Sequence, residues 1–385
     1  MSFPRFLAVV GTLAAFHSPA PPAQASDVHC GDTITQDTRL DADLVSCPGD
    51  GVVIGADHVT LDLNGHTIDG RGAGSGVLAS GRRDVEVTRG AIQGFGEGVT
   101  LDRVTHGAVR NVALGGNDLS CVSSDGCAIE GNSVLGAGIV VAKTSPASPT
   151  LVRRNVVRGA RGPGITVNFA GPETTVEKNR LEGNGSGIEA LHASVGRIND
   201  NTIRASVAEG IRASAGGDSQ IAHNLIWQNG GDGIVLDHFV DAQVYGNYVA
   251  RNRRNGIRGQ TLARPLVEDN VVLRNGANGI LLAGVSSGQE PTSFAVLTGN
   301  FAARNAKDGI AIGKATHDSD LDGNRAQHNG DDGIDVGSAS ATLTANRTRR
   351  NADRGIEAVA GVTDAGANRA RLNGTSGQCT HVRCR

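Results

Sequence analysis

Charged side chains that could perform acid–base chemistry follow several Gly-Ile pairs in the middle of the chain. They stand one to four places after the isoleucine: Glu189, Arg212, Asp237, His238 and Arg258. In an acidic sugar, an arginine or histidine could remove the proton next to the carboxylate of the sugar. A carboxylic acid side chain, or a calcium ion held by carboxylates, could neutralise the charge of that sugar carboxylate. We therefore predict these five residues as catalytic candidates. The competing interpretation is a set of ordinary ion pairs between neighbouring strands.

Other residues could bind a substrate without reacting with it. The candidates are Asn168, His192, Gln260, Trp227 and Tyr248. The first three also follow Gly-Ile pairs, whereas the two aromatic residues belong to a second set of strands, together with Leu225, Val271 and Phe301. This apolar streak should face outward, where it could bind sugar rings or a partner subunit, or be covered by a loop.

A basic stripe accompanies the apolar streak. One position, four places after a recurring asparagine, is occupied by Arg251, Arg274, Arg304, His328 and Arg350. Such a stripe could hold an acidic glycan. Alternatively, it is a solvated face on which the arginine stems cover apolar surface.

An acidic cluster lies nearer the C-terminus, at Asp308, Asp331, Asp332 and Asp335. Carboxylates are the ligands that calcium prefers, so these residues are candidates for a Ca²⁺ site. The alternative is that they cap turns. No other cofactor is predicted, because no phosphate-binding glycine loop stands between a strand and a helix and no Ser-His-Asp set can be placed.

These candidates can act together only if the fold brings distant residues to one surface, and an internal repeat provides the means. Asparagine recurs every 22 to 24 residues, with a single step of 30, at Asn132, Asn155, Asn179, Asn201, Asn224, Asn247, Asn270, Asn300, Asn324, Asn346 and Asn368. A Gly-Ile pair recurs with the same period, and an aliphatic residue stands three places before most of these asparagines. Three columns in register over more than 200 residues indicate a repeat architecture.

Each repeat predicts three short strands, because alternating apolar and polar residues are interrupted by Gly, Asn and Ser before a helix could form. We predict an all-β fold, a single right-handed parallel β-helix of about 13 coils with three strands per coil. Ile188, Ile211 and Ile234 should then lie directly over one another. A leucine-rich repeat is disfavoured because leucine is not the repeated residue. Longer turns at residues 145–150 and 284–293 could wall a groove.

The ends of the chain differ from the repeat. Residues 1–25 resemble a secretory signal peptide, with an apolar run after Arg5 and small residues before Ser26. We predict an N-terminal cap at 26–52, the β-helix at 53–373 and a disulfide-closed C-terminal cap at 374–385. Six cysteines form three local pairs, Cys30 with Cys47, Cys121 with Cys127 and Cys379 with Cys384. Disulfides are favoured over a zinc site and suit a secreted, extracellular protein.

The stretch Val59–Ile68, with the recurring Asn and Gly-Ile motifs, resembles secreted β-helix proteins of the pectate-lyase-like superfold. The closest resemblance is to the NosD-like branch, also described as carbohydrate-binding and sugar-hydrolase repeats. It implies an acidic polysaccharide as partner and, for the Gly-Ile face, lyase or epimerase chemistry in preference to glycoside hydrolysis. The catalytic signatures of polygalacturonases, mannuronan epimerases and pectate lyases are incomplete or absent here, so a non-catalytic carbohydrate-binding or surface module is the alternative.

Composition limits the other partners. The 385 residues carry a formal charge of −3, so no general attraction to nucleic acid is expected. After removal of the signal peptide, no apolar stretch is long enough to cross a membrane as a helix. The sequence does not determine the oligomeric state.

Overall fold

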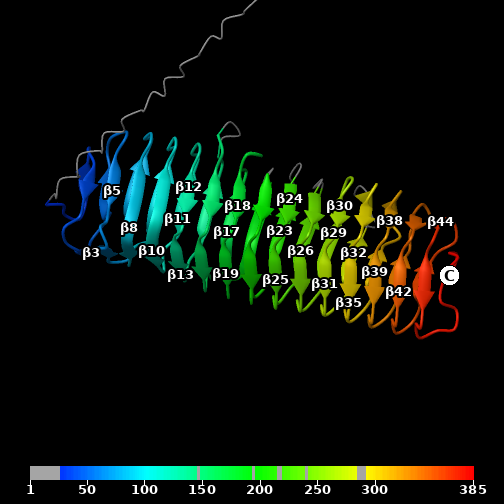
Figure 1. Cartoon of the computed structure of the whole chain (residues 1–385). Coiled ribbons are helices and arrows are strands. Elements are labelled where there is room, and N and C mark those ends of the chain that lie inside the picture. The colour runs from blue at the N-terminus through cyan, green and yellow to red at the C-terminus, as the bar shows by residue number, and fades with distance from the viewer. Residues whose placement is uncertain (1–26, 145–147, 193–195, 215–218, 239–241, 284–291) are drawn as a thin grey trace, which may run out of the picture.

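The computed structural model describes residues 27–144, 148–192, 196–214, 219–238, 242–283 and 292–385. Within them every regular element is a β-strand, and no helix that could cross a membrane is present. The strands stack along the axis of an elongated rod, from the blue N-terminal end to the red C-terminal end (Figure 1). This arrangement confirms the predicted all-β parallel solenoid.

Three strand faces run along the rod. The Gly-Ile sheet has 15 parallel strands, corresponding to about 14 turns of the chain, close to the number expected. Its strands are β1 (Asp32–Ile34), β4 (Val52–Ile54), β7 (Ser75–Ser80), β9 (Glu97–Asp102), β11 (Leu119–Val122), β14 (Ile139–Ala142), β17 (Pro163–Asn168), β20 (Ser186–Leu191), β23 (Ile211–Ser214), β26 (Ile234–Asp237), β29 (Ile257–Gln260), β32 (Ile280–Ala283), β36 (Ile310–Ile312), β40 (Ile334–Val336) and β43 (Ile356–Ala358).

The second face precedes the recurring asparagines. Its strands are β2 (Thr38–Arg39), β5 (Thr60–Asp62), β12 (Ala128–Glu130), β15 (Leu151–Arg153), β18 (Thr175–Glu177), β21 (Arg197–Asn199), β24 (Ser219–Ala222), β27 (Ala242–Tyr245), β30 (Leu266–Glu268), β34 (Val296–Thr298), β38 (Asp320–Asp322), β41 (Thr342–Thr344) and β44 (Thr363–Gly366). Two short strands, β33 (Thr292–Ser293) and β37 (Thr316–His317), pair separately.

The third face follows the asparagines. Its strands are β3 (Leu44–Cys47), β6 (Thr67–Gly70), β13 (Ser133–Leu135), β16 (Val156–Arg158), β19 (Arg180–Glu182), β22 (Thr202–Arg204), β25 (Leu225–Trp227), β28 (Tyr248–Ala250), β31 (Val271–Leu273), β35 (Phe301–Ala303), β39 (Arg325–Gln327), β42 (Arg347–Arg349) and β45 (Arg369–Arg371). The long strands β8 (Glu86–Gln93) and β10 (Ala108–Gly115) contribute to both the second and third faces.

The interior is a set of stacked aliphatic columns. Ile188 pairs in register with Ile211, and Ile211 with Ile234, as predicted. All three side chains are fully buried. Removal of such apolar surface from water is the main stabilising contribution to a core that contains few aromatic residues.

The recurring asparagines form a hydrogen-bonded ladder at one corner. The backbone N–H and the side-chain amide of Asn201 both donate to Oδ1 of Asn224, at 3.0 and 3.1 Å. The same amide donates to the carbonyl of Val176 at 2.9 Å. This pattern repeats to Asn368 and satisfies polar groups that burial would otherwise penalise.

The glycine before each isoleucine is required by close packing between coils. A Cβ atom on Gly256 would lie 2.2 Å from a methyl carbon of Val272 and 2.6 Å from the carbonyl oxygen of Gly279. Only glycine allows the backbone to approach its neighbours so closely. The Gly-Ile motif therefore combines a tight corner with an inward-facing anchor.

One disulfide lies near each end of the rod, and a third lies between them. Cys30–Cys47, Cys121–Cys127 and Cys379–Cys384 are all formed, which confirms the predicted pairs. Residues 26–52, expected as a cap, contain β1, β2 and β3, which pair with the next coil. The expected signal peptide lies outside the described residues.

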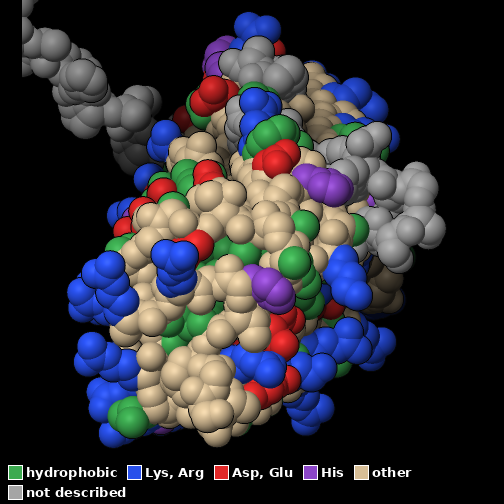
Figure 2. Space-filling view, turned by 90° about the vertical axis from the view of Figure 1, so that its right-hand side faces the viewer, with side chains coloured by type: hydrophobic (Ala, Val, Ile, Leu, Met, Phe, Trp, Pro, Cys, Tyr) green, Lys and Arg blue, Asp and Glu red, His purple; other side chains and the backbone are tan. Residues whose placement is uncertain are grey.

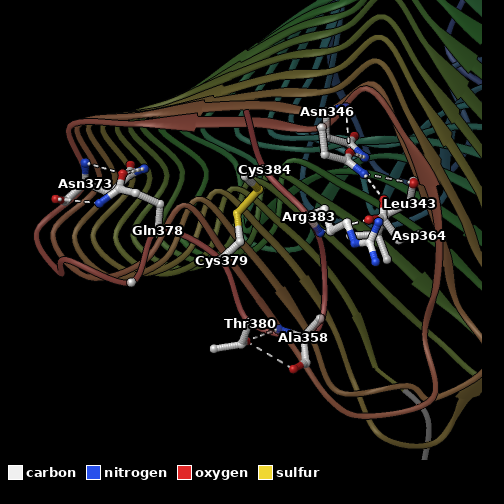
Figure 3. The surroundings of a disulfide bond; sticks show 12 residues. Leu343, Asn346, Ala358, Asp364, Asn373, Gln378, Cys379, Thr380, Arg383 and Cys384 are labelled. Atoms are coloured by element: carbon white, nitrogen blue, oxygen red, sulfur yellow. Dashed lines mark hydrogen bonds between the residues drawn. A yellow bond between two sulfur atoms is a disulfide. The ribbon is translucent and has the colours of Figure 1, made fainter.

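A second ladder joins Asn229, Asn252, Asn275, Asn305, Asn329, Asn351 and Asn373, five places after members of the first. At the C-terminal end, Gln378 occupies the place of a further asparagine in this second ladder (Figure 3). Its Oε1 accepts hydrogen bonds from the backbone N–H and side-chain amide of Asn373, at 3.0 and 2.8 Å. Nearby, Thr380 Oγ1 accepts from the backbone N–H of Ala358 at 2.9 Å. The segment that carries the last disulfide thus covers polar groups of the final coil.

Candidate functional site

The Gly-Ile sheet brings the predicted catalytic residues onto neighbouring strands. Arg212 on β23 lies in register with Glu189 on β20, and Ser214 with Asp237 on β26. On the following strand, β29, Arg258 is in register with Val235. The juxtaposition expected from the repeat spacing is therefore present.

These charges are joined in an ion-pair network. The Asp237 carboxylate is buried, and its oxygens lie 3.5 Å from Arg212 Nη2 and 3.3 Å from Arg258 Nη1. Arg258 Nε also lies 2.9 Å from the buried Asp232 carboxylate. Val235, in register with Arg258, is likewise buried. Both arginines thus already have carboxylate partners, and Asp237 is not presented to solvent.

The remaining candidates on this face are dispersed. Glu189 accepts a hydrogen bond from Ser186 Oγ at 2.8 Å, and Gln260 accepts one from Arg258 at 2.9 Å. His192 is exposed and stacks on Phe169, with ring centroids 4.9 Å apart. His238 is two coils further along the rod, and Asn168 lies on β17, next to β20. Most of the two predicted walls, at 145–150 and 284–293, lies outside the described residues.

Trp227 and Tyr248 lie on the third face, not beside the catalytic candidates. They belong to β25 and β28, which are in register with each other. Next to them is a cavity of about 390 Å³ lined by Tyr248, Ala250, Arg251, Leu273, Arg274, Phe301, Ala303, Arg304, Gln327 and His328. We call this cavity the third-face groove. It combines the predicted apolar streak with the predicted basic stripe.

The basic stripe occupies backbone positions in the left-handed region. Towards the N-terminus the equivalent positions are Gly136, Gly159 and Gly183, followed by Ala205 and Gln228, all with positive φ. Further along the rod, Arg251 and Arg274 take the same conformation, with φ of 55° and 54°. A left-handed residue other than glycine costs roughly 1 to 2 kcal/mol. Several residue types therefore occupy this unfavourable position, and along the groove most of them are arginines.

The arginines of the groove differ from those of the Gly-Ile sheet in their partners. Within the described part of the chain, no carboxylate forms an ion pair with Arg251, Arg274 or Arg304. All three side chains are exposed. The groove thus presents uncompensated positive charge next to aromatic rings.

The acidic cluster is partly assembled as predicted. Carboxylate oxygens of Asp308, Asp331 and Asp332 lie within 4.8 Å of one another, whereas Asp335 is outside this group. A second group joins Asp332 with Asp353 and Glu357. Asp332 Oδ1 also accepts the backbone N–H of Arg354 at 2.7 Å, so the capping role is present as well.

Burial and mutual repulsion hold protons on this cluster. Burial, with the charges of Asp335 and Asp331, raises the pKa of Asp308 to about 6. Burial, with Glu357 and Asp308 nearby, raises the pKa of Asp332 to about 8. Burial and the charges of Glu357 and Asp331 also raise the pKa of Asp335. A bound cation would relieve this repulsion, but it would compete with protons at neutral pH.

A family model described as "Periplasmic copper-binding protein (NosD)" matches residues 58–261 and 228–369, which together cover most of the chain. The chain belongs to the NosD family. The match spans the β-helix from its early coils to the last ladder asparagine, and it confirms the resemblance inferred from the sequence. No curated protein sequence matches the chain.

The NosD description names copper, but the described residues contain no set of side chains suited to binding it. Copper favours imidazole and sulfur ligands. All six cysteines form disulfides, and the sole methionine is Met1. His58 and His106 each contact one oxygen of Asp84, at 3.2 and 3.1 Å, from coils on either side of it. In the part of the chain that the structure describes, the two groups of three side chains close enough to share a metal ion consist of carboxylates, which are not the ligands that copper favours.

Solved structures share the fold of this NosD family member. The catalytic unit of an α-1,3-glucanase from Streptomyces thermodiastaticus matches with a TM-score of 0.54 and 15% identity, over 90% of this chain and 64% of the glucanase chain. The periplasmic alginate epimerase AlgG gives 0.44 and 14%, over 82% and 73%. The A-module of a mannuronan C-5 epimerase from Azotobacter vinelandii gives 0.41 and 12%, over 91% of both chains. At 15% identity the likeness to the glucanase shows the fold alone, and no inference is drawn from the two structures with TM-scores below 0.5.

Three features of the surface were missed from the sequence of this NosD family member. The sequence analysis did not predict Asp232 as a partner of Arg258, nor Asp353 and Glu357 as members of the acidic cluster. Nor did it predict that Arg347, Arg349, Arg369 and Arg371 lie together beyond the groove. In each case the signal was available, because residues one coil apart become neighbours in a solenoid.

Proposed function

We propose that the protein binds an extended acidic polysaccharide in the third-face groove and acts there as a recognition surface. The observation that supports this most strongly is the row of exposed Arg251, Arg274 and Arg304 in one cavity with the rings of Tyr248 and Phe301. Exposed guanidinium groups without carboxylate partners are suited to binding anions. The Gly-Ile sheet offers less, because its arginines are already paired with Asp232 and Asp237.

The geometry of a β-helix suits a repeating ligand. Successive coils place equivalent side chains roughly 4.8 Å apart along the rod axis. A polysaccharide lying along this axis would meet one arginine of the stripe at each coil, while its rings could pack on Tyr248 and Phe301. The aromatic rings supply affinity for the sugar, and the guanidinium groups supply preference for acidic sugars.

We further propose that the protein acts outside the cytoplasm. Three disulfides with no free cysteine among the described residues fit an oxidising compartment. The family description names the periplasm. The α-1,3-glucanase that shares the fold is named for a polysaccharide substrate, which is consistent with a glycan partner for this protein.

Isothermal titration calorimetry with uronate oligosaccharides and neutral glucan oligosaccharides of equal length tests the proposal. We expect the acidic oligomers to bind more tightly, and Arg274→Gln/Arg304→Gln to weaken their binding at least about tenfold, because charge-assisted hydrogen bonds contribute roughly 1.5 to 3 kcal/mol each. Tyr248→Ala should weaken binding about fivefold through loss of ring packing.

The matched control is Arg83→Gln/Arg154→Gln. Both of these arginines are exposed and far from the groove along the rod, and the double variant loses the same charge. Unchanged affinity in Arg274→Gln/Arg304→Gln, or an equal loss in the control, would contradict the assignment of binding to this groove.

A further inference from the structure

The outer surface of the third face changes character along the rod. In one register column, Leu225, Tyr248, Val271 and Phe301 are followed by Arg325, Arg347 and Arg369. In the next outward column, Trp227, Ala250, Leu273 and Ala303 are followed by Gln327, Arg349 and Arg371. Apolar residues thus give way to arginine over β39, β42 and β45.

Four of these residues form a compact group, which we call the arginine cluster: Arg347, Arg349, Arg369 and Arg371. Arg347 is in register with Arg369, and Arg349 with Arg371. Neighbours across the strands are roughly 4.8 Å apart, and neighbours along one strand roughly 7 Å. All four side chains are exposed, so the guanidinium groups are available to a ligand.

The cluster is electrostatically unfavourable in isolation. Like charges placed directly opposite one another on paired strands are destabilising. In the ranges that the structure describes, no carboxylate forms an ion pair with any of the four. The chain as a whole has a formal charge of −3, so the cluster does not reflect a generally basic composition. An external anion would remove the repulsion.

A cavity of about 220 Å³ lies within the cluster. It is lined by Gln327, Arg347, Thr348, Arg349, Arg369 and Arg371. Gln327 also lines the third-face groove, so the two cavities are adjacent. They differ in chemistry, because the rings of Tyr248 and Phe301 line the groove and no aromatic residue lines the smaller cavity. In the end-on view of Figure 2, Lys and Arg side chains gather along the lower left edge.

We propose that the arginine cluster is a binding site for a pair of linked phosphate groups, as in a diphosphate. A guanidinium group donates two parallel hydrogen bonds to a phosphate, and four such groups in one small cavity match a ligand with several charges close together. A single carboxylate would leave most of these cations uncompensated. The cavity has the size for a small anion, and the neighbouring groove would accommodate a saccharide attached to it.

Inorganic pyrophosphate, inorganic phosphate and citrate are the probes that test this site, by isothermal titration calorimetry at low ionic strength. Citrate carries several charges on carboxylates in place of phosphates, so it separates phosphate recognition from simple charge attraction. We expect pyrophosphate to bind at least about tenfold more tightly than phosphate or citrate, because more charge-assisted hydrogen bonds form. Glucose 1-phosphate, added as a fourth probe, should bind more tightly than inorganic phosphate only if the attached sugar also contacts the groove.

The variant is Arg347→Gln/Arg369→Gln, and the control is again Arg83→Gln/Arg154→Gln. We expect the first to lose pyrophosphate binding at least about tenfold and to melt no lower than the wild type, since a repulsive pair has been removed. Equal binding of citrate, or retained pyrophosphate binding in the cluster variant, would overturn the inference. Binding of uronate oligosaccharides is measured on the same samples. Loss of the phosphate proposal for the cluster can therefore be distinguished from loss of the polysaccharide proposal for the groove.

Discussion

Replacement of one ladder asparagine should destabilise the rod far more than replacement of an exposed neighbour. In Asn224→Ala, four side-chain hydrogen bonds disappear. Oδ1 no longer accepts from the backbone N–H and amide of Asn201, at 3.0 and 3.1 Å. Nδ2 no longer donates to the carbonyl of Ile198 and to Oδ1 of Asn247, at 2.8 and 3.0 Å.

The magnitude follows from these contacts. A net contribution of about 1 kcal/mol per hydrogen bond gives a loss of about 4 kcal/mol. The partners left without a hydrogen bond are themselves buried, which adds to the loss. Because a domain has a total stability of roughly 5 to 15 kcal/mol, a single substitution of this kind should be easily measured.

Urea unfolding, followed by circular dichroism, provides the measurement, and Arg197→Ala on the preceding coil is the control. Arg197 is exposed and should change stability by less than about 0.5 kcal/mol. Since a solenoid can open locally, hydrogen exchange at β21, β22 and β24 should report the same loss. A change below about 1 kcal/mol for Asn224→Ala would refute the view that the ladder stabilises each coil individually.

Three further predictions concern charge and packing. The folded pKa values of Asp308 and Asp332, about 6 and about 8, exceed the ordinary value of 3.8, so the stability they contribute is complete in acid and is lost as pH rises from about 4 to about 8. Asp332→Asn should flatten this dependence of the melting temperature, and calcium, if it binds, should stabilise the wild type more at pH 8 than at pH 5. Arg212→Ala removes one of the partners of buried Asp237 and should lower the free energy of unfolding in urea by about 1 to 3 kcal/mol, while uronate binding stays unchanged. If the wild type forms an unsaturated, ultraviolet-absorbing product from uronate polymers and this variant does not, catalysis would instead be assigned to the Gly-Ile sheet. Gly256→Ala should cost about 1 to 3 kcal/mol through overpacking against Val272, and an unaltered melting temperature would contradict the predicted close approach.

Much of the fold could be predicted because a solenoid converts a fixed spacing in the sequence into contact. Ile188, Ile211 and Ile234 stand 23 residues apart and lie in one column, and the asparagines follow the same rule. The local disulfides could be predicted as well, since each pair is separated by only a short segment. Periodicity therefore determined both the elements and their register.

The functional surface was harder to predict, because side-chain pairing depends on direction and burial as well as on register. Arg212 and Arg258 were placed correctly, but the buried carboxylate of Asp237 between them turns two candidate bases into members of an ion-pair network. Asp335 is close to the acidic cluster in sequence, yet Glu357, one coil later, lies nearer to Asp332. Side-chain geometry within each coil determines which charged groups pair, and the repeat spacing does not specify that geometry.

Gln378 has a consequence for assembly. In the second ladder each asparagine from Asn229 to Asn351 obtains the partner for its amide from the coil that follows, so a rod that stopped at Asn373 would offer that amide to another molecule. By folding back onto Asn373, Gln378 provides the missing partner within the same chain. A shortened protein that ends before this glutamine should consequently join end to end into filaments, whereas extra repeats inserted farther upstream should lengthen the monomer and leave it soluble.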